Sequence, residues 1–259
     1  MKSIFTLLLI SIIAVPASSQ QWKILGGYNL GIPLGELNDN INPVHSLQTG
    51  ARYQLDGKLK RLSIIVEGGL GIYAMQRIDQ TFTFDNTSAI VPVNYNSNAL
   101  NANLALQYDL ADGEKFIVPY VNVKGGYYSL FSNIYVENPR DGVSCHALQQ
   151  ENIIKDGTFT WSAGTGVQLN AALFAKNKYR REISIDIGVN YLRGGSLDYI
   201  NTKRLIDAQT INQPGSKPLQ VQFINASTQN IHEHTVAQVY NSKLRMVEVR
   251  LGVVVEINR

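Results

Sequence analysis

The sequence has few charged residues and only one cysteine. Charged residues make up 17% of its 259 residues and the net charge is +3, whereas soluble domains are roughly 25% charged. This near-neutral balance argues against a nucleic-acid-binding domain, so no nucleic-acid partner is expected. Cys145 has no second cysteine to pair with, which excludes a disulfide-stabilised scaffold. The 44% of apolar residues is enough to argue against a disordered chain.

Long apolar runs are missing after the first residues. The run from Ile4 to Val15 follows Lys2 and precedes small residues. It is shorter than the ~18 residues of a membrane-spanning helix and is typical of a secretory leader. We expect a signal peptide over residues 1–19 and one mature domain over 20–259, with a retained membrane anchor as the less favoured alternative.

Alternation of apolar and polar residues dominates the mature chain. In the cleanest segment, alternate residues from Val247 to Ile257 are apolar, and the residues between them include Glu248, Arg250 and Glu256. A period of two residues is the repeat of a β-strand, and no helical period of comparable length competes with it. The alternation predicts eight strands, over 22–32, 47–55, 62–73, 100–109, 117–128, 159–173, 183–191 and 247–257.

The polar face of these strands is unusual for a water-exposed surface. It consists largely of Gly, Ser, Asn and Gln, with glycines such as Gly164, Gly166 and Gly188. Glycine weakens a strand, but it makes room where a small closed barrel crowds its interior. We therefore predict an all-β fold, an eight-stranded antiparallel transmembrane β-barrel that is apolar outside and polar inside. A soluble lipocalin-like barrel is the alternative.

The links between the predicted strands alternate in length. An outer-membrane barrel has short periplasmic turns and long extracellular loops, which is the same asymmetry. Asp56-Gly57 and Asp112-Gly113 are dipeptides of tight hairpin turns. The long links are 33–46, 78–98, 129–157 and 194–241, and the short ones are 56–60, 110–115 and 174–180.

Aromatic residues on the apolar face give a second indication. Trp and Tyr gather where acyl chains meet headgroups, so a membrane barrel carries an aromatic girdle at each rim. The predicted periplasmic girdle is Trp22, Tyr53 and Tyr108, and the predicted outer girdle is Tyr127, Trp161 and Tyr191.

The strand count, the link asymmetry and the final strand resemble the small eight-stranded outer-membrane barrels of the outer membrane protein A and X type, including PorT-like porin-family proteins. The resemblance implies a protein of the Gram-negative cell outer membrane, surrounded by outer-membrane lipids and lipopolysaccharide and inserted by the barrel assembly machinery. Such barrels commonly end in an aromatic residue, whereas this sequence ends Ile257-Asn258-Arg259. The resemblance contains no short functional motif and therefore concerns the fold.

Seven of the charged residues on the polar face are expected to lie in the lumen. Buried charges are costly unless they are paired, and side chains fill the interior of an eight-stranded barrel. We predict an ion-pair network that plugs the lumen, with a salt-bridge gate or narrow channel as the alternative. The predicted network is Lys23, Arg52, Glu67, Lys124, Asp186, Glu248 and Arg250.

The long links contain the candidates for other chemistry. Imidazole and thiolate ligands suit zinc or copper, so a speculative metal site is Cys145, His146, His232 and His234, although the spacing matches no standard pattern.

His45-Ser46 is the only candidate for the catalytic residues of a lipid A-modifying enzyme. Neighbouring strand residues point to opposite faces and cannot form a nucleophile–base pair. We therefore expect no enzyme, no catalytic residue and no cofactor.

The long links are the main functional candidates, because binding residues concentrate on loops held by a rigid scaffold. The largest, from Gly194 to Asn241, contains an alternating apolar stretch at Leu219, Val221 and Phe223. We expect the loops to bind a protein or a cell-surface ligand. The alternative is an accessory part of an outer-membrane secretion machine.

Overall fold

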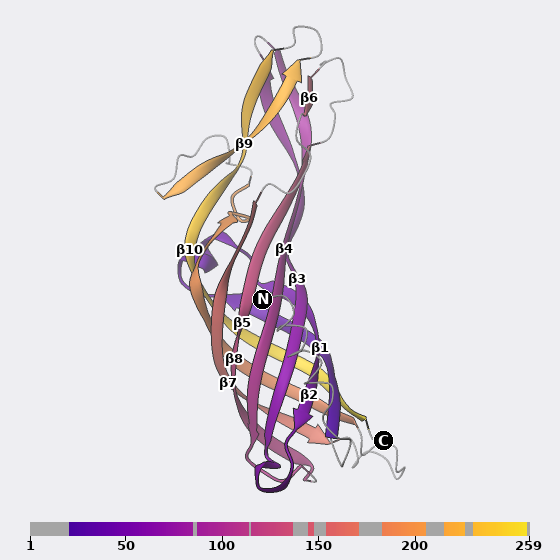
Figure 1. Ribbon diagram of the computed structural model, residues 1–259. Helices are drawn as coiled ribbons and strands as arrows, with labels where there is room; N and C mark the ends of the chain where they lie inside the picture. Colours follow the sequence, from indigo (N-terminus) through magenta and orange to yellow (C-terminus); the bar gives the residue numbers. More distant parts are fainter. Residues whose placement is uncertain are drawn as a thin grey trace, which may run out of the picture.

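The computed structural model describes residues 21–84, 87–113, 115–136, 145–147, 154–170, 183–205, 215–225 and 230–257. The predicted leader lies outside these residues. The described part is almost entirely β-structure (Figure 1). No helix in it is long and apolar enough to cross a membrane.

Eight strands form a closed antiparallel barrel. Neighbouring strands are hydrogen-bonded in the order β1-β2-β3-β4-β5-β7-β8-β10, and β10 pairs again with β1 to close the ring. The predicted eight-stranded antiparallel barrel is thus confirmed. The strands are β1 (Gln21–Pro33), β2 (Val44–Gln54), β3 (Leu62–Phe84), β4 (Thr87–Asp109), β5 (Ile117–Val136), β7 (Ile154–Asn170), β8 (Ile183–Ile200) and β10 (Ile231–Ile257).

The two ends of the barrel differ. At one end, here called the turn end, short connections over 55–61 and 110–116 join β2 to β3 and β4 to β5. The first of these contains a 3-10 helix, η1 (Gly57–Leu59). At the other end, here called the extended end, β3, β4 and β10 continue well beyond the ring (Figure 1). Of two further strands, β9 (Ser216–Asn225) pairs with the extension of β10, and β6 (Cys145–Ala147) pairs with β9.

The extended end departs from the predicted strand limits. The segment 78–98 is expected to be a loop, but its described residues continue β3 and β4, paired from Ile78↔Val93 to Phe84↔Thr87. The predicted link 194–241 likewise contains the end of β8, all of β9 and the start of β10. A short helix, α2 (Glu36–Asn40), lies in the β1–β2 connection. The alternation is weaker in the strand extensions, because polar residues such as Gln80 and Gln238 also occupy buried positions there.

Three buried apolar clusters follow one another along the molecule. The smallest lies inside the ring near the turn end and consists of Leu25, Ile65, Ala105 and Val254. A larger one fills the barrel near the extended end and includes Leu37 and Ile41 from α2. The third lies between the strand extensions, beyond the ring. The polar interior predicted from the alternation is therefore interrupted by apolar layers.

Candidate functional site

The outer surface of the ring is apolar. Along β10 the outward residues from Val247 to Ile257 are all aliphatic, and along β8 the outward residues from Ile183 to Tyr191 are also apolar. A tilted strand rises ~2.5 Å per residue along the barrel axis, so the β10 run covers about the ~25 Å apolar band of a membrane barrel. Burial in lipid removes this surface from water. The arrangement is that of an outer-membrane β-barrel.

The six residues of the two predicted girdles lie on this outer surface, near its two edges. Near the turn end, Trp22 and Tyr53 are directly paired across β1 and β2, with ring centroids 5.1 Å apart. Tyr108 is paired with Leu62 at the same end. Near the extended end, Trp161 and Tyr191 are 6.5 Å apart, and Tyr127 packs edge-on against Phe159 at 5.6 Å. Phe159, which is 82% exposed, is a further outward aromatic that the predicted girdle does not include.

Four of the seven predicted lumen charges meet in one buried cluster. Lys124 Nζ lies 2.6 Å from Glu67 Oε1, and Arg250 Nη1 lies 2.9 Å from Glu67 Oε2. Arg250 Nε also lies 3.1 Å from Asp186 Oδ2. The four side chains come from β3, β5, β8 and β10, so the cluster bridges the interior from opposite walls. Because all four are less than a tenth exposed, each charge depends on its partners for compensation.

The other two predicted cations pair with carboxylates that the prediction omitted. Arg52 Nη2 lies 2.5 Å from Asp109 Oδ2, and Arg52 is completely buried. Nearer the turn end, Lys23 Nζ lies 3.7 Å from Glu256 Oε2. Asp109 and Glu256 are on the polar face of the predicted strands, so they were visible in the sequence. Their roles depend on strand register, which the alternation does not fix.

Glu248 is the remaining predicted member of the network. Its carboxylate accepts a hydrogen bond of 3.1 Å from Asn29 Nδ2. Among the described residues, no cationic group lies within 4.0 Å of it. In the part of the chain that the structure describes, the charges discussed above comprise four cations and five carboxylates. The prediction from sequence had four cations and three carboxylates.

Glycine and tyrosine complete the packing of the lumen. A β-carbon added to Gly166 would overlap the Tyr120 ring, and one added to Gly164 would overlap the side-chain oxygen of Asn190. Tyr120 is 2% exposed. These glycines leave space for large side chains from other strands, which is the role expected of glycine in a narrow barrel.

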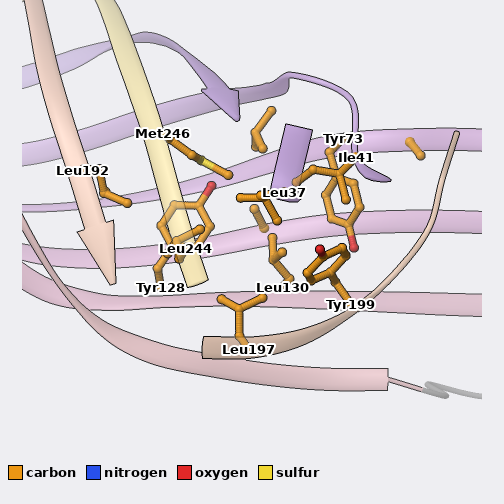
Figure 2. Packing of buried hydrophobic residues seen from close by; sticks show 13 residues of the cluster. Leu37, Ile41, Tyr73, Tyr128, Leu130, Leu192, Leu197, Tyr199, Leu244 and Met246 are labelled. Carbon is orange, nitrogen blue, oxygen red and sulfur yellow. The ribbon is translucent and has the colours of Figure 1, made fainter. Parts of the chain in front are cut away.

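Apolar side chains pack together in the lumen near the extended end. Figure 2 shows Leu37 and Ile41, from the α2 segment, lying among tyrosine, leucine and methionine side chains of the barrel wall. Leu37 and Ile41 are completely buried. We call this cluster the apolar plug. Its members are Leu37, Ile41, Val44, Tyr73, Ala74, Ala99, Tyr128, Leu130, Leu192, Leu197, Tyr199, Leu244 and Met246.

Hydrogen bonds hold the α2 segment in place. The backbone N–H of Thr202 donates to the carbonyl of Asn40 at 2.9 Å, and Asn201 Nδ2 donates to Asn40 Oδ1 at 2.8 Å. Asn40 Nδ2 in turn donates to the Tyr199 hydroxyl at 3.1 Å. The β1–β2 connection is thus tied, past β10, to the residues after β8.

Beyond the ring, the extended end has its own buried core. Val91, Val93 and Tyr95 of β4 pack with Val236 of β10 and other apolar residues. The Tyr95 hydroxyl donates to the carbonyl of Val236 at 2.5 Å, and Gln80 Nε2 donates to the same carbonyl at 3.2 Å. Burial raises the pKa of Tyr95. The extension is therefore a packed structure.

The four residues of the speculative metal site lie in one three-stranded sheet at the extended end. Cys145 and His146 belong to β6, His232 and His234 belong to β10, and β9 lies between these two strands. Strands two positions apart are separated by roughly 10 Å. The described residues contain no cluster of three or more metal-ligating side chains. The metal site stays a prediction.

His45 and Ser46 point to opposite sides of the barrel wall, as adjacent strand residues do. His45 is exposed, and its Nδ1 lies 2.5 Å from the Tyr28 hydroxyl. Ser46 is buried, and its hydroxyl donates to the carbonyl of Asn29 at 3.1 Å. The structure does not bring them together as a nucleophile and base.

No family model and no curated protein matches the chain. Three solved structures of similar architecture are Neisserial surface protein A (12% identity), Ail, the attachment invasion locus protein of Yersinia pestis, in complex with the heparin analogue sucrose octasulfate (9%), and the outer membrane protein OprG from Pseudomonas aeruginosa (10%). The matches cover 93–94% of this chain and 97–100% of the other chains, each with a TM-score of 0.41. At such low similarity they give no information about function.

Proposed function

We propose that this outer-membrane β-barrel is a non-enzymatic binding protein, with a closed lumen and a rigid binding surface at its extended end. In this proposal residues 1–19 form a leader that is removed on export. The turn end faces the periplasm and the extended end faces the outside, because membrane barrels have short periplasmic turns and long extracellular segments.

The buried core of the extended end is the observation that supports this proposal most directly. Burial of nine residues, including Val91, Tyr95 and Val236, makes the extension rigid. A channel needs no such structure beyond its rim. Rigid elements that carry surface residues at fixed positions are the usual basis of specific binding.

Three layers of side chains support a closed lumen. The small apolar cluster lies near the turn end, the cluster around Glu67 lies in the middle, and the apolar plug lies near the extended end. A permeating ion would have to pass both apolar layers without hydration, which is strongly unfavourable. We propose that the ion pairs seal the lumen, whereas a gate would require Leu37 and Ile41 to leave the mouth.

A shortened hairpin tests the binding function. Joining Arg77 to Asn94 through Asn-Gly removes the outer part of β3 and β4, from the Ile78↔Val93 pair outward, and leaves the ring intact. The control is Lys58→Ser in η1, at the turn end. In cells that lack the native protein, we expect the control to restore cell-surface attachment and the shortened barrel to fail.

The outcomes separate the alternatives. Loss of secretion with normal attachment would favour the accessory part of a secretion machine. A changed lipid A mass spectrum after gene deletion would favour the lipid A-modifying enzyme. Sustained conductance steps of the pure protein in a planar bilayer would refute the closed lumen and favour the channel.

A further inference from the structure

Two arginines face each other on the outside of the barrel, where β8 meets β10. Arg193 and Arg245 are direct partners across these strands, and both side chains are exposed. Lys243, the next outward residue on β10, is exposed too. Like charges directly opposite one another destabilise a sheet. No carboxylate group of the described residues lies within 4.0 Å of these three cationic groups. The sheet therefore carries an uncompensated positive cluster.

The depth of this cluster in the membrane follows from the strands that carry it. The outward apolar run of β10 ends at Val247 and is followed by Arg245, and that of β8 ends at Tyr191 and is followed by Arg193. Trp161 is paired with Arg193 in the same row of the sheet. Because Trp and Tyr lie where acyl chains meet headgroups, the three cations lie at the level of the headgroups on the extended side.

Local backbone geometry is special at this point. Arg245 pairs with Arg193, and Lys243 pairs with Ser196, so two glycines on β8 oppose the single residue Leu244 of β10. Such a β-bulge re-aims the side chains beside it. The N–H of Gly195 donates to the Thr158 hydroxyl at 3.0 Å. The bulge is thus tied to β7.

Two other strands of the rim, β4 and β5, do not repeat this pattern. On β4 the outward residues beyond Leu100 are amides, including Asn98 and Asn96. On β5 the residue beyond Tyr127 is Ser129. The doubled arginine row with an adjacent lysine is therefore a feature of the β8–β10 side.

We propose that Arg193, Arg245 and Lys243 bind the phosphate groups of an outer-leaflet lipid of the lipid A type. A guanidinium group binds phosphate oxygens through two parallel hydrogen bonds, and a phosphate between the two arginines would relieve their repulsion. The acyl chains of the same lipid would lie on the apolar surface below, beside Trp161 and Tyr191. This proposal rests on the insertion of the barrel in the outer membrane and adds a specific lipid partner.

Native mass spectrometry of the full chain in detergent micelles tests the proposal, with bisphosphorylated lipid A, its dephosphorylated form and phosphatidylcholine as probes. We expect the wild-type barrel to retain bisphosphorylated lipid A preferentially. A cation near an anionic headgroup contributes about 1 kcal/mol, so affinity should fall about fivefold for each of Arg193→Gln, Arg245→Gln and Lys243→Gln. Affinity for the dephosphorylated lipid should not change.

The matched control is Arg61→Gln, which removes the same charge at the turn end. Equal retention of the phosphorylated and dephosphorylated forms would overturn the proposal, and so would an equal loss in Arg61→Gln. Retention of free inorganic phosphate in place of the lipid would also overturn it, because the site would then recognise a soluble anion. Insertion is measured separately, from the change in gel mobility of the folded barrel on heating. A barrel that inserts without preferring the phosphorylated lipid refutes the lipid site alone, whereas failure to insert refutes the membrane barrel.

Discussion

Replacing Glu67 by Gln is the most direct test of the buried ion cluster. Glu67 bonds Lys124 and Arg250 at 2.6 and 2.9 Å, and Arg250 has a second partner in Asp186. Without the Glu67 charge, Lys124 has no carboxylate within 4.0 Å among the described residues. Leaving one charge of a buried pair uncompensated costs about 3–5 kcal/mol, so we expect the free energy of unfolding to fall by this amount.

A double-mutant cycle separates the ion pair from its surroundings. Lys124→Met alone leaves Glu67 paired with Arg250. The double variant, which combines Glu67→Gln with Lys124→Met, removes both charges of the Glu67–Lys124 pair. Because the double variant no longer buries an unpaired lysine, we expect it to be more stable than the sum of the single effects implies, by about 2 kcal/mol. Arg61→Gln is the exposed control. Its ion pair with Asp112, at 3.1 Å, is screened by water, so we expect a much smaller change.

The two tryptophans provide the signal for this assay. Trp22 and Trp161 lie on the lipid-facing surface, 44% and 53% exposed in the isolated barrel, so urea unfolding of the barrel from lipid vesicles transfers both from lipid to water and shifts their fluorescence. The single variants and the double variant are compared at one pH and one lipid composition. A loss below about 1 kcal/mol for Glu67→Gln, or strictly additive effects, would refute the view that this pair is a compensated buried charge.

Three further predictions use other parts of the barrel. Gly164→Ala should lower the free energy of unfolding by about 1–3 kcal/mol, because the new methyl group overlaps Asn190, whereas Gly125→Ala, which has open space on the outer surface, should have little effect in the same urea assay. Leu37→Ala should loosen the apolar plug at a cost of about 2–5 kcal/mol, and hydrogen exchange of residues 36–41 should accelerate more than that of β1. The Arg61 and Lys60 side chains lower the pKa of Asp112, so its stabilising effect is present above the unfolded pKa and is lost as the pH falls through the lower folded pKa. At pH values below about 4, the urea midpoint of the wild type should therefore fall more steeply with decreasing pH than the midpoint of Asp112→Asn. Parallel curves for the two proteins would contradict this.

The sequence was sufficient to predict the barrel because lipid and lumen impose opposite chemistry on alternate residues. The outward run from Val247 to Ile257 and the glycine-rich inner face need no tertiary information to be recognised. The cluster around Glu67 could also be proposed, because a charge on the inner face of a narrow barrel must find a partner. The actual pairing of the lumen charges could not be predicted. For example, whether Arg52 meets Asp109 depends on the register of strands that are distant in the sequence.

The apolar plug was missed for a different reason. Leu37 and Ile41 lie in the β1–β2 connection, which has no periodic pattern, and only the folded barrel shows that they turn inward. Leu25 and Ile65 are buried at the turn end on a face that was predicted to be polar. Such positions conflict with the simple alternation, because apolar layers also belong to the interior of this barrel.

The closing seam of the ring has a consequence for how the protein folds. It joins the first strand to the last, from Trp22↔Ile257 to Pro33↔Met246, so its hydrogen bonds connect the most distant parts of the described chain. Contacts of such large sequence separation form slowly, and until they form both outer strands present unpaired edges that attract other chains. The chain cannot complete its ring before β10 has been synthesised. A protected state that shields these two edges is therefore required between synthesis and insertion.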